Sequence, residues 1–463
     1  MPLISLLNPK EIEFIYWSIF ALNKKVGIIS LGCNKNLVDT EVMLGLLREE
    51  GYEITPDENV ADILIINTCA FIDTARDESM EVIHNLIDSN GKGERKIIVT
   101  GCLAQRYGEE LAEELKGDIH ALVGVGNFQN IVDVCKYILK SDKTIIQISP
   151  TPAYIYDHSV PRLRTTPPHL AYVKISEGCN NRCSYCIIPQ LRGPYRSRSI
   201  DSILAEVAVL SEFGVKEINL IGQDTTCYGR DLNDGSNLVV LLKELVNVPK
   251  THWIRFMYGH PNHIDDELLE LVAKEEKICS YIDIPIQHIH DDILKRMARR
   301  TTQKQIFQLI DKIRNTIPYV TLRTSLIVGF PGENDVHFKA LIDFVEQAQF
   351  DHLGVFAYSR EKNTKAYDLD EQVPESIKQE RLSQIASLHQ SIADKKRRAL
   401  IGRRTKVIVD DILPQAKGRT QGQAPEVDDI TYITKSDSCE PGDIVDIEII
   451  DTYEIYDLIG RLI

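Results

Sequence analysis

The chain has 463 residues, of which 43% are hydrophobic and 26% charged, and its formal net charge is −15 at pH 7. A chain of this length is expected to fold into about three domains. The acidic balance argues against extended binding to a nucleic-acid backbone as the main activity and suits a basic protein partner better. Ten cysteines are spread along the whole length, which indicates a cytoplasmic protein whose thiols serve metals or packing.

Residues 1–23 are expected to form an N-terminal extension. They contain an apolar run, residues 14–22, that is too short to cross a bilayer. The residues before this run lack the basic start of a secretory signal, and no small-residue cleavage pattern follows it. The sequence therefore predicts no membrane association.

Three short apolar runs between residues 24 and 140 each end in a cysteine. "VGIISLGC" ends at Cys33, "ADILIINTC" at Cys69 and "KIIVTGC" at Cys102. Such runs are typical of strands buried on both faces, and the helical patterns between them predict a parallel α/β sheet. Because the carboxyl ends of parallel strands share one edge, the three thiols can converge as a ligand set. The alternative is three structural cysteines that pack as small hydrophobic groups.

The rest of the chain divides into a linker and two further domains. Residues 141–168 are rich in proline and are predicted to be a linker. Residues 169–398 contain six strand-like runs separated by helical patterns, which predict a partial (βα)6 barrel with its site at the strand carboxyl ends. The runs are "AYVKISEGC", "VKEINLIGQD", "WIRFMYGH", "YIDIPIQH", "TLRTSLIVGF" and "HLGVFAYS". Residues 399–463 read as short strands and turns, which predict a small all-β barrel.

Three cysteines lie within eight positions of "SEGCNNRCSYCIIPQLRG": Cys179, Cys183 and Cys186. A structural zinc site needs four ligands, and a disulfide framework needs an even count in a small secreted chain, so neither fits well. Three thiolates can instead hold three corners of a [4Fe–4S] cube and leave the fourth iron open for a small ligand. The alternative is a loop of three unrelated thiols.

The CxxxCxxC spacing, with Tyr185 just before the third cysteine, resembles the signature of the radical S-adenosylmethionine (SAM) superfamily. In that superfamily the open iron binds the amino and carboxylate groups of SAM. The resemblance implies that further SAM contacts come from other strand ends. One candidate is Tyr185 of the motif itself. The others are Gln223 and Asp224 after the second strand, Arg323 within the fifth strand and Gly329 at its end. Gln287 and His288, at the end of the fourth strand, are weaker candidates.

Two cysteine triads followed by a small β-module resemble the radical SAM methylthiotransferase family, which joins an auxiliary-cluster domain, a radical SAM barrel and a TRAM module. The resemblance implies that Cys33, Cys69 and Cys102 bind an auxiliary [4Fe–4S] cluster and that the second triad binds the SAM-cleaving cluster. "SLGCNKNLVDTE" is similar to the SLGCPKNLVD pattern of the RimO branch, although Asn34 replaces the proline. The acidic character of residues 399–463, with seven basic and thirteen acidic residues, favours a basic protein over RNA.

The resemblance implies a chemistry for the enzyme. Cleavage of SAM gives a radical that removes hydrogen from the β-carbon of an aspartate in small-subunit ribosomal protein number twelve, and a sulfur and a methyl group are then inserted. The expected partners are this basic protein, free or on the assembled small subunit, and an electron donor such as flavodoxin or ferredoxin.

Two alternatives to this function stay open at the level of sequence. One is a methylthiotransferase that acts on a tRNA adenosine, and the other is a non-catalytic iron–sulfur carrier. The remaining cysteines have no partners at ligand spacing, and we assign them packing roles: Cys135, Cys227, Cys279 and Cys439.

Overall fold

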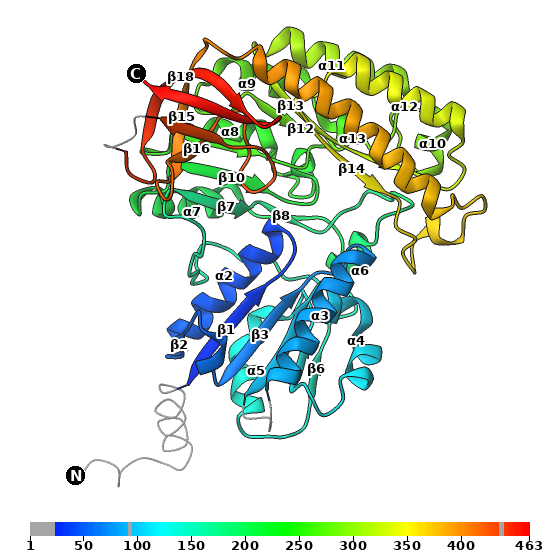
Figure 1. Ribbon diagram of the computed structural model, residues 1–463. Coiled ribbons are helices and arrows are strands. Elements are labelled where there is room, and N and C mark those ends of the chain that lie inside the picture. The colour runs from blue at the N-terminus through cyan, green and yellow to red at the C-terminus, as the bar shows by residue number, and fades with distance from the viewer. Residues whose placement is uncertain (1–23, 91–94, 435–438) are drawn as a thin grey trace. The chain divides into compact units, whose positions relative to one another are not determined.

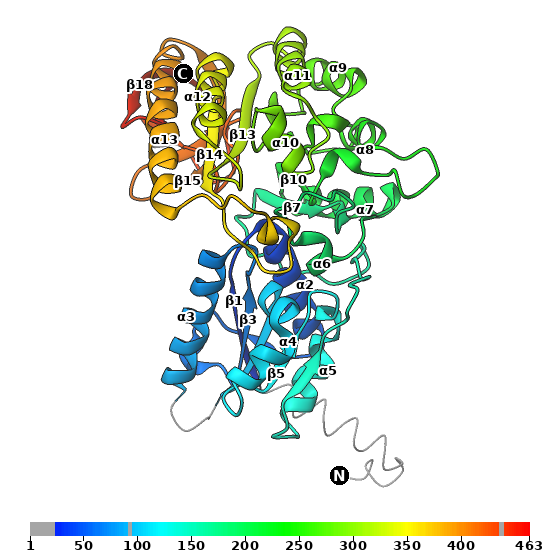
Figure 2. The same cartoon turned by 90° about the vertical axis from the view of Figure 1, so that its right-hand side faces the viewer.

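The structure of the protein is a computed structural model that describes residues 24–90, 95–434 and 439–463. The expected extension, residues 1–23, lies outside the described residues. The chain divides into two compact units (Figures 1 and 2). The first unit comprises residues up to Thr165 together with Glu177–Asn180 and Ile187–Arg196, and the second comprises Thr166–Ser176, Asn181–Cys186 and Ser197–Ile463.

The first unit contains a six-stranded sheet of order β2-β1-β3-β4-β5-β6 in which every neighbouring pair is parallel. The predicted parallel α/β sheet is therefore confirmed. Its central strands follow from their sequences, since "ILIINT" is apolar at nearly every position and lies buried on both faces. The strands are β1 (Lys25–Ser30), β2 (Glu53–Ile54), β3 (Ile63–Thr68), β4 (Lys96–Gly101), β5 (Ala121–Val123) and β6 (Ile145–Gln147).

Helices cover both faces of this sheet, as strands that are buried on both faces require. Helices α3 and α4 share one apolar cluster with β3 and β4, whereas α2 packs against α5. In Figure 1, β1 and β3 run between α2 and α3. The helices are α2 (Asn34–Glu49), α3 (Asp73–Ser89), α4 (Cys102–Glu114), α5 (Ile131–Ile138) and the short α6 (Ile188–Arg192), with 3-10 turns η2 (Glu58–Val60) and η3 (Phe128–Asn130).

The second unit contains the six predicted βα strands, arranged as two parallel three-stranded sheets of order β11-β10-β7 and β12-β13-β14. Ile254 and Ile278 form a parallel bridge beside β11. The predicted partial barrel is confirmed. The strands are β7 (Leu170–Lys174), β10 (Glu217–Ile221), β11 (Trp253–Phe256), β12 (Tyr281–Asp283), β13 (Thr321–Val328) and β14 (His352–Ala357), and the short β8 (Ser176–Glu177) pairs with β9 (Arg196–Ser197).

The helices of this partial barrel begin at capping residues that the sequence supplies. Ser199, Asn237 and Asp265 each accept a hydrogen bond from the backbone of the first turn of α7, α8 and α9. Helices α12 and α13 lie side by side in both views (Figures 1 and 2). The helices are α7 (Ile200–Glu212), α8 (Leu238–Leu245), α9 (Asp266–Lys274), α10 (Asp291–Arg296), α11 (Gln303–Thr316), α12 (Asp335–Ala348) and α13 (Glu375–Arg398), with η4 (Thr225–Cys227), η5 (Pro261–His263) and η6 (Lys365–Asp368).

The C-terminal strands of the second unit close into the predicted small barrel, in the order β15-β16-β17-β19-β18. Its interior holds alternate apolar residues of the strands, including Val407, Val409 and Ile447. Gly460 allows β19 to pass close to β18, because a Cβ there would lie 2.2 Å from Ile447 Cδ1. The strands are β15 (Arg404–Asp411), β16 (Lys417–Thr420), β17 (Thr431–Thr434), β18 (Ile444–Tyr453) and β19 (Asp457–Leu462).

A buried ionic network joins this small barrel to the partial barrel. Glu217 at the start of β10 is fully buried and receives Arg255 Nε at 3.2 Å and Arg419 Nη1 at 2.6 Å. Arg419 also pairs with Asp410 at 2.8 Å, and His169 Nε2 lies 2.9 Å from the same carboxylate. Burial raises the pKa of Glu217, but the two arginines outweigh it and the pKa is lowered. Loss of Glu217 would leave the buried charge of Arg255 without its carboxylate partner, at a cost of about 3–5 kcal/mol.

Among the described residues, every helix is too short or too polar to cross a membrane.

Candidate functional site

The first predicted triad follows three neighbouring strands of the first unit. Cys33 is the N-cap of α2 after β1, Cys69 comes directly after β3, and Cys102 is the first residue of α4 after β4. Because β1, β3 and β4 are adjacent and parallel, the three thiols share one edge of the sheet. Two of them also sit at helix N-termini, where the helix dipole favours a thiolate.

Close packing at this edge depends on glycine. Gly32 has φ +90°, and a Cβ there would lie 2.7 Å from Cys69 Cβ and 3.0 Å from its Sγ. A side chain at residue 32 would therefore collide with Cys69. Asn34, which departs from the family pattern, is the first residue of α2, a position that both proline and asparagine can occupy. The departure therefore costs the local backbone nothing.

The three thiols also influence one another electrostatically. Burial is the main cause that raises the pKa of Cys102 to about 12; Arg192 opposes the rise, and the neighbouring Cys69 and Cys33 add to it. Burial likewise raises the pKa of Cys69. Burial would also raise the pKa of Cys33, but the charges of Lys35 and Arg192 outweigh it and the pKa is lowered. Three coupled sulfurs beside cationic groups suit a soft metal centre that binds thiolates.

Arg192 at the end of α6 supplies the buried positive charge of this triad, and sequence reasoning did not find it. It is 2% exposed, and its Nη2 lies 3.8 Å from Cys102 Sγ and also contacts Asn36 Oδ1. Its Nη1 lies 3.1 Å from Asp39 and 3.0 Å from Glu177. The only signal in the sequence was its place in "PQLRG", shortly after the CxxxCxxC motif.

The second predicted triad is distributed over both units. Cys179 belongs to the first unit, where it is buried and its N–H donates to Gly193 O at 3.2 Å. Cys183 and Cys186 belong to the second unit, where both are half-buried and the Cys186 N–H donates to Cys183 O at 3.2 Å.

The segment that carries Cys183 is fastened within the second unit. Ser184 donates from its Oγ to Arg296 O at 2.8 Å and from its N–H to Met297 O at 3.0 Å. The buried Arg299 lies with Nη1 4.0 Å from Cys183 Sγ and 3.5 Å from Tyr185 Oη. Each unit therefore places a buried arginine beside predicted cysteine ligands, and the sequence alone identified neither.

Two predicted SAM contacts lie together in the second unit. The Tyr185 ring packs edge-on against Phe330, with 6.5 Å between ring centroids, and Phe330 directly follows Gly329. Gly329 has φ +70°, and its N–H donates to Glu333 Oε1 at 2.9 Å. A Cβ at residue 329 would lie 2.3 Å from Lys378 Cγ, so this turn requires glycine.

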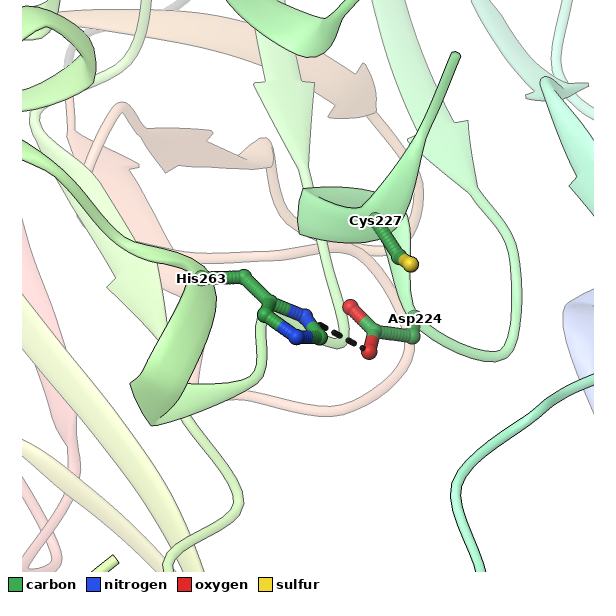
Figure 3. A group of neighbouring side chains, drawn as sticks. All are labelled: Asp224, Cys227 and His263. Carbon is green, nitrogen blue, oxygen red and sulfur yellow. Dashed lines mark hydrogen bonds and ion pairs between the residues drawn. The ribbon is translucent and has the colours of Figure 1, made fainter. Parts of the chain in front are cut away.

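Asp224, after β10, is held by a group of polar neighbours. It accepts hydrogen bonds from Asn181 Nδ2 at 2.9 Å and Thr226 Oγ1 at 2.8 Å, and it lies 3.1 Å from His263 Nδ1 (Figure 3). Cys227 lies beside it, and the donor atoms of Asp224, Cys227 and His263 are within 4.8 Å of one another. Burial and the Asp224 charge raise the pKa of Cys227 to about 11. Gln223 directly precedes this group.

The remaining candidates lie elsewhere. Arg323 is near the start of β13 and pairs with Asp283 at 3.1 Å and Asp428 at 3.4 Å. It precedes Gly329 by six residues, about 20 Å along an extended strand, so the structure does not bring it to the Tyr185 side. His288 is fully buried with Nε2 3.2 Å from Glu333 Oε2. The Gln287 N–H donates to Ser325 O at 2.8 Å.

Comparison with known families assigns each part of the chain. Residues 25–124 match the "Uncharacterized protein family UPF0004", residues 173–345 match the "Radical SAM superfamily", and residues 401–463 match the "TRAM domain". A relative from Syntrophotalea carbinolica, named "Ribosomal protein uS12 methylthiotransferase RimO", is 48% identical over 95% of this chain and 97% of its own length. The chain belongs to the RimO methylthiotransferase family. The family predicted from the cysteine motifs is thus confirmed.

Other RimO relatives match at similar coverage. Those from Geobacter sulfurreducens and Clostridioides difficile carry the same name and are 47% and 44% identical, each over 95% of this chain and 99% of its own length. A solved structure of the radical SAM methyltransferase TsrM from Kitasatospora setae covers 72% of this chain and 73% of its own, with a TM-score of 0.52 and 15% identity. That likeness supports the fold alone.

As a RimO-family radical SAM transferase, the protein uses two [4Fe–4S] clusters and SAM as cofactors. The residues fit this requirement, since the six predicted cysteines are free thiols that could supply three soft donors to each cluster.

Proposed function

We propose that the protein inserts sulfur and a methyl group at the β-carbon of an aspartate in ribosomal protein uS12. The observation that carries the proposal is the match to relatives named for this activity, at 44–48% identity over 95% of the chain. The alternative substrate is a tRNA adenosine. The C-terminal barrel does not favour it, because residues 399–463 contain seven basic and thirteen acidic residues. Such a surface repels phosphate and suits a basic ribosomal protein.

In this proposal the chain's own groups hold and tune the cofactors. Cys179, Cys183 and Cys186 would bind the SAM-cleaving cluster, and the first triad would bind the auxiliary cluster. When bound, these groups and SAM supply radical chemistry that can remove hydrogen from a saturated carbon, which no side-chain base can do. The positive charges of Arg192 and Arg299 would offset the negative charge that thiolates and clusters bring into buried sites.

The SAM-binding residues are likewise proposed. The Tyr185–Phe330 pair would form an apolar wall, and the glycine at 329 would let the backbone approach the adenine. Gln223 and Asp224 would act from the neighbouring strand end, where Asp224 is already oriented by three polar neighbours. We assign Arg323 to the seam with the small barrel, because it pairs with Asp428 of that barrel as well as with Asp283 on the neighbouring strand β12.

Further elements of the proposal concern partners and location. A cytoplasmic enzyme of this kind would receive electrons from a small carrier such as flavodoxin or ferredoxin. Its substrate would be met free or on the assembled small subunit.

The test compares ribosomal protein and tRNA from a deletion strain with those of the parent by mass spectrometry. We expect the methylthio mass to disappear from uS12 and to persist on tRNA, and a loss from tRNA alone would overturn the proposal. Anaerobic protein with dithionite should also form 5′-deoxyadenosine. Absence of this product from protein with both clusters loaded would favour an electron carrier.

A further inference from the structure

A cavity of about 400 Å³ lies within the second unit, where the starts of β13 and β14 meet the C-terminal barrel. Arg323 and His352 line it from the partial barrel, and Asp428 and Asp429 line it from the loop before β17. It is remote from Tyr185 and Gly329, because Gly329 stands at the opposite end of β13, about 20 Å from Arg323. None of the residues proposed above to hold the clusters or SAM lines it.

The cavity contains more negative than positive charge. Arg323 is shared between Asp283 and Asp428, and Arg397 pairs with Asp429 at 2.9 Å. Within the described part of the chain, Glu454 and Asp457 have no cationic partner within 4 Å, although both line the cavity.

The two lining histidines do not reverse this balance. His352 lies 3.4 Å from Asp428 and 3.2 Å from Asp429. Burial opposes its charge, but the two carboxylates outweigh burial and raise its pKa. Burial lowers the pKa of His389 to about 4, so this ring is neutral near pH 7. Even with His352 charged, the negative groups remain in excess.

The two carboxylate oxygens of Asp428 have different surroundings. Its Oδ2 accepts hydrogen bonds from Tyr281 Oη at 2.7 Å and from the Ala424 N–H at 2.8 Å. Its Oδ1 is buried and accepts no hydrogen bond from any described residue, with the Arg323 and His352 nitrogens 3.4 Å away. Buried oxygens of this kind usually accept a hydrogen bond, whereas this one has only two ion-pair contacts at 3.4 Å.

An aromatic wall completes the cavity. The rings of His389 and Tyr456 are stacked, with centroids 6.3 Å apart and an angle of 21° between their planes. Tyr456 is 38% exposed, and Val427, which also lines the cavity, is 40% exposed, so the cavity opens to solvent. A flat guanidinium can stack on such rings while its five donors reach carboxylates, which a compact ammonium does less well.

We propose that this cavity binds an arginine side chain of the basic ribosomal protein substrate, at a segment distant from the modified aspartate. The inference rests on the proposed function, because it takes its occupant from that substrate. An RNA phosphate is the wrong occupant, because the unpaired carboxylates repel it. The cavity thus acts as a docking site that lowers the KM for the protein substrate and leaves the chemical step unchanged.

The experiment uses anaerobic full-length holoenzyme and purified uS12. The variant E454Q/D457N removes both unpaired charges without changing shape. The matched control E440Q/D446N removes two charges from the same barrel outside the cavity. We expect the first variant to raise the KM for uS12 about tenfold with kcat unchanged, the scale of one charge-assisted contact. We expect the control to change the KM less than twofold.

Three results would overturn the inference. The first is an equal KM for uS12 in E454Q/D457N and in the control, and the second is a fall in the kcat of E454Q/D457N with no change in its KM. The third is that E454Q/D457N differs from the parent only by binding a ribosomal RNA fragment more tightly. An iron count and 5′-deoxyadenosine formation equal to those of the parent establish that the variant is folded. If the parent enzyme itself does not modify uS12, the proposed function fails. If the parent modifies uS12 and the two variants behave alike, only the docking site fails.

The occupant is tested directly by isothermal titration of the holoenzyme with N-acetylarginine methylamide and with its neutral citrulline counterpart. Heat from the arginine probe alone, lost in E454Q/D457N, supports the inference. Equal heat from both probes contradicts it.

Discussion

Arg192 Nη2 lies 3.8 Å from Cys102 Sγ, and the same guanidinium pairs with Asp39 and Glu177. One buried cation therefore connects the segment that follows the CxxxCxxC motif, residues 187–196, with the thiol edge of the sheet inside the first unit. Burial opposes a charge on Arg192, yet Glu177, Cys102 and Asp39 hold its pKa well above the usual range. The arginine stays charged, and its charge is available to thiolate ligands.

Replacing Arg192 by methionine should therefore remove the auxiliary cluster. The substitution removes the arginine that pairs with two buried carboxylates, Asp39 and Glu177, and it withdraws the charge that favours ionised sulfur. We expect the iron count of anaerobically purified protein to fall from about eight to about four per chain. The R192K variant should retain more iron, since it keeps the charge. Full iron loading in R192M would contradict the role given to this residue.

Substitutions in the two cysteine triads should affect different steps of the reaction, SAM cleavage and sulfur insertion. C183A should abolish 5′-deoxyadenosine formation and leave the spectrum of the first unit's cluster in place. C69A should form 5′-deoxyadenosine and yield no methylthio product. C135A is the matched control, because Cys135 is fully buried in α5 away from either triad, and it should keep both activities. Methylthiolation by C69A at the parent rate would show that the first triad has no part in sulfur transfer.

Replacing Gly32 by alanine should affect the auxiliary cluster, whereas the same change at Gly214, which has the same φ angle, should not. Gly32 and Gly214 both have φ +90°, but a Cβ on Gly214 meets nothing within 4 Å, whereas one on Gly32 lies 2.7 Å from Cys69 Cβ. Both alanine variants should lose about 1–2 kcal/mol of stability to left-handed strain. Only G32A should also lose auxiliary-cluster iron, measured by iron and sulfide analysis. Equal iron in the two variants would mean that Cys69 does not depend on this close approach.

Acid should destabilise the protein through buried histidines. Burial lowers the pKa of His389 to about 4 and that of His260 to about 3, whereas in the unfolded chain a histidine titrates near 6.5. Below pH 6.5 the unfolded state therefore binds protons that the folded state does not, and the free energy of unfolding falls as the pH falls from 6.5 towards 4. His352 has the opposite shift, and its contribution is already complete below pH 6.5.

Denaturant unfolding at pH 6.5 and pH 4.5 measures this effect. The difference in the free energy of unfolding between the two pH values should shrink by about 2 kcal/mol in H389Q. The H84Q variant changes an exposed histidine on α3 and should leave the difference unaltered. If H389Q and H84Q give the same pH dependence, His389 is not kept neutral by the fold.

The sequence by itself determined the parallel sheet, the six βα strands, the terminal barrel and the family. These depend on local patterns, since an apolar run reports a strand buried on both faces and a CxxxCxxC spacing keeps its ligands within one loop. It also predicted that Cys33, Cys69 and Cys102 lie at one edge of the sheet, because parallel strands align their carboxyl ends.

Only the tertiary structure decided which distant groups meet those thiols. Arg192 reaches Cys102 across 90 positions of sequence, Arg299 reaches Cys183 across 116, and Arg323 pairs with Asp428. Cys227, assigned to packing, stands beside Asp224 and His263. Local periodicity records only whether a side chain is buried. Its partner is fixed by the packing of whole elements against one another, and that packing is a property of the complete chain.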